Sequence, residues 1–388
     1  MRPRGRRARR PAVRGKTGVW RPGVIVSWAA AHRFEAWRVH KMSAKPQLSR
    51  LGIIWALSFA AGLTTAAWAD PPTLSIYQIQ YTTNADGSSN YDGQVVDCIG
   101  GIVVGKFPGS KPRLILQDPN FPDGWGGIQV KDWIQPDYDL FNHAEVGDWI
   151  EFTNMLVEES WGTTFLHRQT AYNPGYSVVS QGNAVPAAIV VSVSDIPAPV
   201  HDPNEDEWFV ANHDAEPYES MRLTVRDVTV TEMDLGDFVD NYQLEDGEGG
   251  ACWAADYMNQ DVGDWGYHEF VDVGRHFCAV TGVFEQYTWI AEGYDSYDYY
   301  QLITLDTAGL AICGDGNADG VVDLGDLPRF VECMTGPMCE PGGGCWPPAW
   351  TQPPLLLPVE RGLMMDMDYD GDVDLHDFGG FQLIFAGP

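Results

Sequence analysis

Between Asp70 and Ile312, hydrophobic and polar residues alternate in short runs, which predicts a body made mainly of β-strands. Val, Ile, Tyr, Thr and Trp recur at every second position within these runs, and Gly, Asp, Asn and Pro separate one run from the next. A period of two places successive side chains on opposite faces of a strand. At about 240 residues, this body is long enough for two small domains.

A weak internal repeat divides the body into two units. The segments VVDCIGGIVV, LILQD and VGDWIEFTNMLVE recur later in the same order as MRLTVRDVTV, YQLED and VGRHFCAVTGVFE. We therefore expect β domains at residues 70–193 and 220–310. Residues 194–219 are rich in Pro and acidic side chains, so they are expected to form a linker.

The order of strands and turns within each unit resembles small Greek-key barrels of the OB type. In the first unit Leu116-Gln117-Asp118-Pro119 precedes a Trp-Gly-Gly-Ile turn at residues 125–128, as in OB-like domains of secreted bacterial proteins. The resemblance implies a mainly β fold with two OB-like barrels in tandem. A β-sandwich is the alternative architecture.

Helical periodicity is found after two acidic loops near the C-terminus. Both twelve-residue loops offer oxygen-bearing side chains at positions 1, 3, 5, 9 and 12 and a backbone carbonyl at position 7. These residues are Asp315, Asn317, Asp319, Val321, Asp323 and Asp326 in loop 1, and Asp366, Asp368, Asp370, Asp372, Asp374 and Asp377 in loop 2. Gly320 and Gly371 occupy position 6, where calcium loops turn sharply. A duplicated pattern favours two calcium ions over a pair of solvated acidic turns.

Paired loops of this kind, each followed by a helix and closed by Asp at position 12, resemble type I dockerin repeats. The resemblance covers residues 312–388 and implies an α-helical module that binds two calcium ions and docks onto a cohesin-type receptor. Dockerins read their partner through polar residues at positions 10 and 11, which here are Leu324-Gly325 and Leu375-His376. A long insert also separates the loops, so calcium binding follows more directly than cohesin docking.

Residues 42–69 have the features of a secretory signal. Lys45 and Arg50 precede the apolar stretch Leu51 to Leu63, and Ala67-Trp68-Ala69 forms a cleavage site. We expect Met42 to be the true start, residues 1–69 to be absent from the mature protein, and the product to be secreted without a membrane span. An arginine-rich nucleic-acid-binding arm is the competing interpretation of residues 1–41.

Cleavage would make the protein strongly anionic. Residues 1–69 hold 14 of the 24 Lys and Arg residues but only one of the 54 acidic residues. Nucleic-acid binding depends on Lys and Arg that displace counterions from phosphates. The charge therefore predicts no nucleic-acid partner, and a neutral glycan or a protein partner instead.

The seven cysteines suit the oxidising compartment that a signal peptide implies. We expect Cys252 to pair with Cys278, and the C-terminal cluster to form two bridges among its own members, with zinc binding as the alternative. That cluster consists of Cys313, Cys333, Cys339 and Cys345. Cys98 remains as the odd thiol.

No nucleophile elbow, phosphate-binding glycine loop or H-E-x-x-H helix is present in residues 70–388, so no catalytic residue is predicted. Most tryptophans should belong to barrel cores, but Trp125 and Trp161 lie near turns and could stack on sugars or bases. The sequence favours a secreted, non-catalytic binding or scaffold protein. The alternative is a dockerin-bearing hydrolase of polysaccharides.

Overall fold

The structure is a computed structural model that describes most of the chain after residue 69. It describes residues 70–108, 111–134, 138–202, 207–236, 240–262, 266–290, 296–317, 319–334, 364–369 and 373–385. The predicted signal peptide, the start at Met42 and the cleavage site at Ala69 therefore lie outside the described residues. All the described residues belong to one compact unit.

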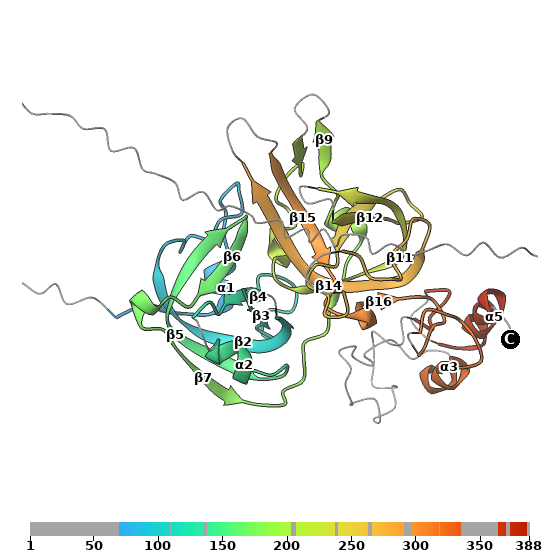
Figure 1. The fold of residues 1–388 in the computed structure, drawn as a ribbon, viewed down its shortest axis with the longest axis horizontal. Coiled ribbons are helices and arrows are strands. Elements are labelled where there is room, and N and C mark those ends of the chain that lie inside the picture. The colour runs from blue at the N-terminus through green and yellow to red at the C-terminus, as the bar shows by residue number, and fades with distance from the viewer. Residues whose placement is uncertain are drawn as a thin grey trace, which may run out of the picture. The chain divides into compact units, whose positions relative to one another are not determined.

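The first sheet closes into a five-stranded barrel. Its strands are β2 (Val95–Phe107), β3 (Arg113–Gln117), β4 (Gly127–Lys131), β5 (Trp149–Ser160) and β6 (Thr163–His167). They pair in the order β2-β3-β4-β6-β5, and β5 pairs with β2 to complete the ring (Figure 1). Only the β4–β6 pair of this ring is parallel. A closed barrel confirms the mainly β prediction and excludes a sandwich for this unit.

Shorter elements complete the first barrel. They are β1 (Thr73–Leu74), α1 (Ile76–Gln80), α2 (Asp139–His143), η1 (Thr170–Tyr172) and β7 (Gly175–Ser180). The side chain of Ser75 caps α1 by accepting a hydrogen bond from the Gln78 N–H. Ile76 and Ile79 of this helix join the buried core. In β2, Gly100 has a φ of +71°, and a Cβ there would lie 1.5 Å from the Ile150 carbonyl oxygen, so only glycine fits this irregularity.

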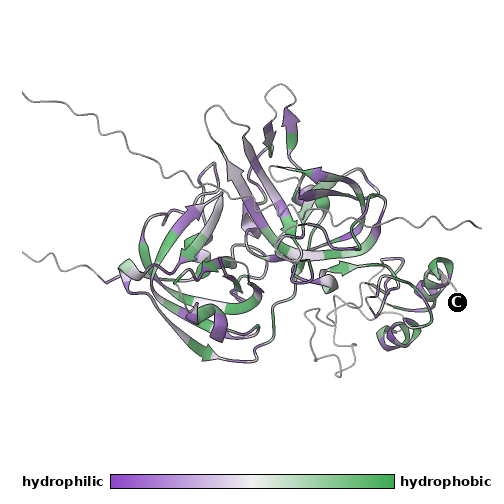
Figure 2. Cartoon of the chain, viewed as in Figure 1, coloured by the Kyte–Doolittle hydropathy of each residue, from purple (hydrophilic) through white to green (hydrophobic). Residues whose placement is uncertain are grey.

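The second sheet repeats this pairing scheme. Its ring consists of β11 (Arg222–Leu235), β12 (Asn241–Glu245), β13 (Ala251–Ala255), β14 (His276–Trp289) and β15 (Tyr297–Ile303). β14 pairs with both β11 and β15, and the β13–β15 pair is parallel. The segments matched by the internal repeat are equivalent strands: β2 with β11, β3 with β12, and β5 with β14. Hydrophobic and hydrophilic residues alternate along strands of both sheets (Figure 2).

Residues 194–219, which their composition predicts to be a linker, contain short elements of secondary structure. The segment contains the end of η2 (Val193–Asp195), then β9 (Val200–Asp202), β10 (Glu207–Phe209) and η3 (Glu216–Tyr218). β9 pairs with β10, which adds to β15, and β8 (Ile189–Val190) pairs with β11. Trp208 packs against the buried Trp253, with ring centroids 4.9 Å apart. This aromatic contact attaches the segment to the second barrel in spite of its acidic and Pro-rich composition.

The two barrels share a buried apolar cluster. Its members are Val104 and Ile115 from the first barrel, and Met258, Val283, Ile303 and Leu305 from the second. Beside it, Arg113 of β3 pairs with Glu285 of β14 at 3.2 Å. Because they share a core and an ion pair, we expect the two barrels to unfold together rather than as independent domains.

The C-terminal part begins with η4 (Thr307–Gly309) and β16 (Leu310–Ala311), which pairs with β14. Helices α3 (Leu327–Cys333) and α5 (Leu375–Ile384) follow the two acidic loops. Phe330 and Phe381 lie in the shared core of these helices, with ring centroids 5.3 Å apart. None of the helices in the described part of the chain is long and apolar enough to cross a membrane.

The disulfide prediction was wrong for Cys278. This residue of β14 is bonded to Cys313, not to Cys252, because the pairing of β16 with β14 brings their Cα atoms to 4.9 Å. Cys252 and Cys98 are buried thiols, the latter as expected for the odd cysteine. Cys333 is buried in α3, and Cys339 and Cys345 lie outside the described residues.

Candidate metal centre

Loop 1 is organised around two buried carboxylates, those of Asp315 and Asp326. Asp315, at position 1, accepts hydrogen bonds from the N–H groups of Asp319 and Gly320, at 3.1 and 2.7 Å. Asp326, at position 12, accepts from the N–H groups of Asn317 and Asp323, at 3.1 and 2.7 Å. These bonds wrap the backbone of the loop around the two carboxylates.

Loop 2 is organised in the same way at its closing residue. Asp377, at position 12, accepts from the N–H groups of Asp368 and Asp374, at 3.3 and 2.7 Å. It also accepts from the N–H of Met367 at 2.5 Å. Asp377 and Asp366, at position 1, are both buried.

The two loops share the hydrogen bonds of their closing halves. The position 3 and position 9 amides donate to the position 12 carboxylate in both loops. In addition, the position 11 N–H donates to the position 9 carboxylate at 2.6 Å in each, from Gly325 to Asp323 and from His376 to Asp374. Sequence similarity at a constant offset thus extends to the hydrogen bonds that shape the loops.

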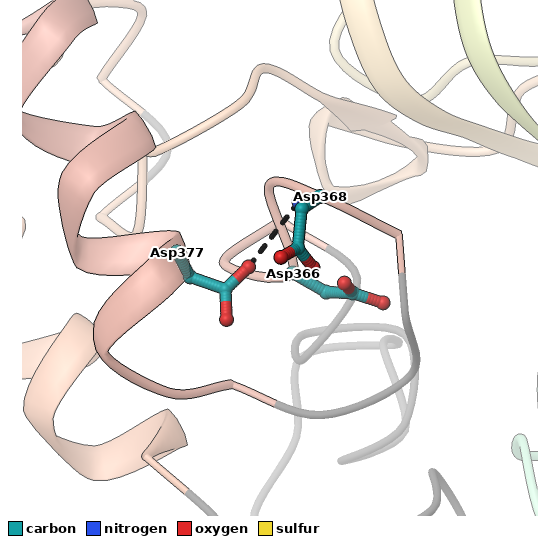
Figure 3. A group of neighbouring side chains, drawn as sticks. All are labelled: Asp366, Asp368 and Asp377. Carbon is teal, nitrogen blue, oxygen red and sulfur yellow. Dashed lines mark hydrogen bonds between the residues drawn. The ribbon is translucent and has the colours of Figure 1, made fainter. Parts of the chain in front are cut away.

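Three carboxylates of loop 2 converge in a geometry that could hold a metal ion. One oxygen atom from each of Asp366, Asp368 and Asp377 lies within 4.8 Å of the others (Figure 3). Asp366 and Asp368 come from the loop, and Asp377 comes from the helix that follows it. The other predicted ligands of this loop, Asp370 and Asp372, lie outside the described residues.

Burial makes the negative charge in both loops unfavourable. It raises the pKa of Asp315, and the nearby carboxylates of Asp326 and Asp319 raise it further. Burial likewise raises the pKa of Asp377, with an added contribution from Asp368. Crowded, buried carboxylates favour either protons or a cation.

The chemistry of the donor set fits calcium. The side chains at the ligand positions offer only oxygen atoms, which hard cations prefer, and no thiol or imidazole stands among them. Gly320 has a φ of +84°, and a Cβ at this position would lie 2.6 Å from the Phe270 ring. Position 6 of loop 1 thus requires glycine both for its turn and for its contact. Val321, at position 7, is exposed and donates its N–H to Asp319.

One residue that contacts loop 2 belongs to no sequence motif and could not be predicted. Arg226 of β11 donates from Nη2 to Oδ2 of Asp366 at 2.6 Å, across 140 positions of sequence. Its guanidinium also lies over the ring of Tyr369, 5.2 Å from the centroid. The Tyr369 hydroxyl donates to Asp227, the neighbour of Arg226, at 3.1 Å. Loop 2 is therefore in contact with the second barrel through charged and aromatic groups.

Trp125 and Trp161 lie apart from the acidic loops. Both have a positive φ of 62° and occur in turns of the first barrel. The Trp125 N–H donates to the Pro217 carbonyl at 2.5 Å. Trp161 is half exposed and stacks on Tyr287 and Trp289 of β14, at centroid distances of 5.7 and 5.0 Å. Each of these tryptophans thus contacts residues that belong to, or directly precede, the second barrel.

Comparison with known proteins yields matches among solved structures alone. No family model matches the chain, and no curated protein matches it. One structural match is a replication protein A heterotrimer bound to single-stranded DNA, at 10% identity and a TM-score of 0.20, covering 60% of this chain and 68% of that chain. Another is fission yeast Pot1 with single-stranded DNA, at 13% identity and a TM-score of 0.21, covering 54% of this chain and 78% of that chain.

These matches contradict the prediction that the chain has no nucleic-acid partner, because both matched structures contain single-stranded DNA. The prediction was based on net charge. Net charge describes long-range attraction by the whole molecule, but it does not describe the side chains of a local binding face. The prediction is withdrawn.

Proposed function

We propose that this chain is a secreted, non-catalytic binding or scaffold protein whose tandem OB-like barrels carry a dockerin-like, calcium-binding attachment module. The observation that supports the module best is the recurrence of the same hydrogen bonds in both loops. Amides at positions 3 and 9 donate to the position 12 carboxylate in each case. Chance acidic turns would not share bonds at one constant sequence offset.

Calcium binding follows from the chemistry of the two loops. Asp315, Asn317, Asp319, Asp323 and Asp326 would hold one ion with the Val321 carbonyl, and the residues 51 positions later would hold the second. A bound ion would supply the positive charge that offsets the buried carboxylates. The protein residues fix the loop backbone and keep the carboxylates at positions 1 and 12 away from bulk water.

The attachment role is supported by the outer surface of the module. Leu324 and Leu375 occupy position 10 of their respective loops and are 62% and 74% exposed. Exposed leucines at equivalent positions of a duplicated unit give the surface a repeated apolar character. A non-catalytic role for the barrels accords with the lack of a catalytic motif in the mature sequence.

The calcium assignment can be tested by stoichiometry in the secreted chain. Equilibrium dialysis should find two calcium ions per chain in the wild type and one each in Asp319→Ala and Asp370→Ala. Asp272→Ala, which changes an exposed acid of the second barrel, is the control and should retain two. Two ions in both loop variants, or none in the wild type, would show that the loops are not the sites.

Secretion has a separate test. Mass spectrometry of protein from the culture medium should give an N-terminus at Asp70 or within a few residues of it. A product that retains the arginine-rich segment would contradict both the cleavage site and the start at Met42.

A further inference from the structure

The two loops differ in what surrounds their first carboxylate. In loop 2, the buried Asp366 receives a hydrogen bond on Oδ2 from Arg226, a residue of the second barrel whose side chain is itself 21% exposed. In loop 1, Asp315 is bonded by backbone amides of its own loop. Among the residues that the structure describes, no ion pair joins Asp315 to a cationic side chain. In the part of the chain that the structure describes, only loop 2 therefore shares its position 1 carboxylate with a permanent positive charge.

The two loops also differ in the charge of their predicted calcium ligands. The five side-chain ligand positions of loop 1 comprise four aspartates and Asn317, whereas loop 2 has an aspartate at all five. The five side-chain ligands of loop 2 thus carry one more negative charge than those of loop 1, at the position of Asp368, and Asp372 adds a further acidic residue to the loop. The Arg226 guanidinium supplies one positive charge next to this set and offsets the excess.

Arg226 is also part of the contact between loop 2 and the second barrel. Its guanidinium lies over Tyr369, whose hydroxyl bonds to Asp227 on the same strand. Loop 1 has a covalent attachment instead, because Cys313 lies two residues before Asp315 and is bonded to Cys278. The Arg226–Asp366 ion pair is therefore the charged contact between loop 2 and the second barrel. A second cation that binds Asp366 would weaken this ion pair.

We propose that Arg226 is a positioning residue of the second calcium loop, which lowers its calcium affinity by sharing Asp366, and that calcium in turn weakens the attachment of loop 2 to the second barrel. This inference depends on the proposed calcium function. Two cations near one carboxylate repel each other, so each lowers the affinity of the site for the other. Such coupling is reciprocal and typically amounts to a factor of about 5 to 150.

The test measures the affinity of loop 2 alone in the full chain. An Asp319→Ala background disables loop 1, and calorimetric titration with calcium then reports loop 2. Adding Arg226→Gln should tighten calcium binding about tenfold, because the competing charge is gone. Arg226→Met, which keeps an apolar side chain against Tyr369, should act in the same direction and serves if the glutamine variant does not fold.

Two further variants act as controls. Arg226→Lys keeps the charge and should leave the affinity within about twofold of the background. Arg329→Gln removes an arginine of α3 that pairs with the exposed Glu332, and it should also leave loop 2 unchanged. An equal gain in affinity in Arg329→Gln would indicate a general effect of net charge, and a gain in Arg226→Lys would show that the positive charge is not the cause; either result would overturn the proposal.

Thermal unfolding provides a second readout that does not depend on the titration. Reciprocity requires that Arg226→Gln destabilise the chain more in chelator than in saturating calcium. Unchanged or weaker calcium binding in Arg226→Gln would contradict the proposed competition. If the Asp319→Ala background binds no calcium, both the proposed calcium function and the inference are wrong. If it binds calcium but Arg226→Gln leaves the affinity unchanged, only the inference is wrong.

Discussion

The two acidic loops are alike internally but are attached to the second barrel by different means. Their position 12 carboxylates accept the same pair of amide hydrogen bonds, and both are fully buried. Loop 1, however, begins two residues after a disulfide to β14, and loop 2 begins with an ion pair to β11. Local sequence thus determines the shape of a loop, while distant residues determine what its first carboxylate contacts.

The largest expected effect tests the internal similarity of the loops. Asp326→Ala and Asp377→Ala each remove a buried acceptor of at least two amide hydrogen bonds. Hydrogen bonds to charged groups contribute about 1.5–3 kcal/mol each, so each variant should lose about 4 kcal/mol of stability in calcium. Denaturant unfolding that monitors the C-terminal helices would measure this loss.

The similarity predicts that the two variants have comparable effects. Glu332→Ala, on an exposed position of α3, is the control and should change stability little. A severe effect of one variant and a negligible effect of the other would mean that the loops are not equivalent.

The second prediction concerns the covalent attachment of loop 1. Replacing Cys278 and Cys313 together by alanine opens a connection that spans 35 positions. Loss of a native disulfide typically costs 2–4 kcal/mol, so we expect about 3 kcal/mol of destabilisation. Calcium binding by loop 2 should persist, because its carboxylates do not involve the disulfide. Loss of both calcium ions in this double variant would show that the two attachments are not independent.

A third prediction concerns the junction of the two barrels instead of the loops. A buried glutamate there makes the stability of the chain depend on pH. Burial raises the pKa of Glu216 from 4.5 to about 8, and the Glu159 carboxylate adds to the effect. Tyr300 donates a hydrogen bond to Glu216 at 2.7 Å, which lowers this pKa but does not outweigh burial. The protonated carboxyl therefore stabilises the fold fully below about pH 4.5, and this contribution is lost as the pH rises through 8.

Glu216→Gln should imitate the protonated form. We expect it to stabilise the chain at pH 8 by about 2 kcal/mol relative to the wild type, and to make little difference at pH 5. Glu248→Gln, in an exposed turn of the second barrel, is the matched control. Thermal unfolding at both pH values measures the effect, and a variant that is equally stable or less stable at pH 8 would contradict it.

Sequence patterns predicted the strands better than they predicted the contacts between them. Alternation identified the β body, and the internal repeat aligned β2 with β11 and β5 with β14. The short strands of the Pro-rich segment before β11 were not predicted, because composition does not reveal that Trp208 packs on Trp253. The pairing of Cys278 with Cys313 depends on β16, a strand of two residues that has no detectable periodicity.

The candidate metal centre was predictable to the extent that its chemistry is local. A loop of twelve residues carries its own ligands, so Asp315 and Asp377 could be identified from spacing. Arg226 could not, because it lies 140 positions before Asp366 in a strand with ordinary β patterning. A single basic residue in a strand is usually a solvated charge, and only the folded chain brings this one to the loop.

The most direct test of this account is a crystal structure of residues 70–388 grown in calcium, with anomalous data to identify the ions. We predict one calcium peak in each loop, bound by Asp315 and Asp326 in the first and by Asp366 and Asp377 in the second. Absence of a peak from both loops, or ions bound elsewhere with the loops occupied only by water, would contradict the account.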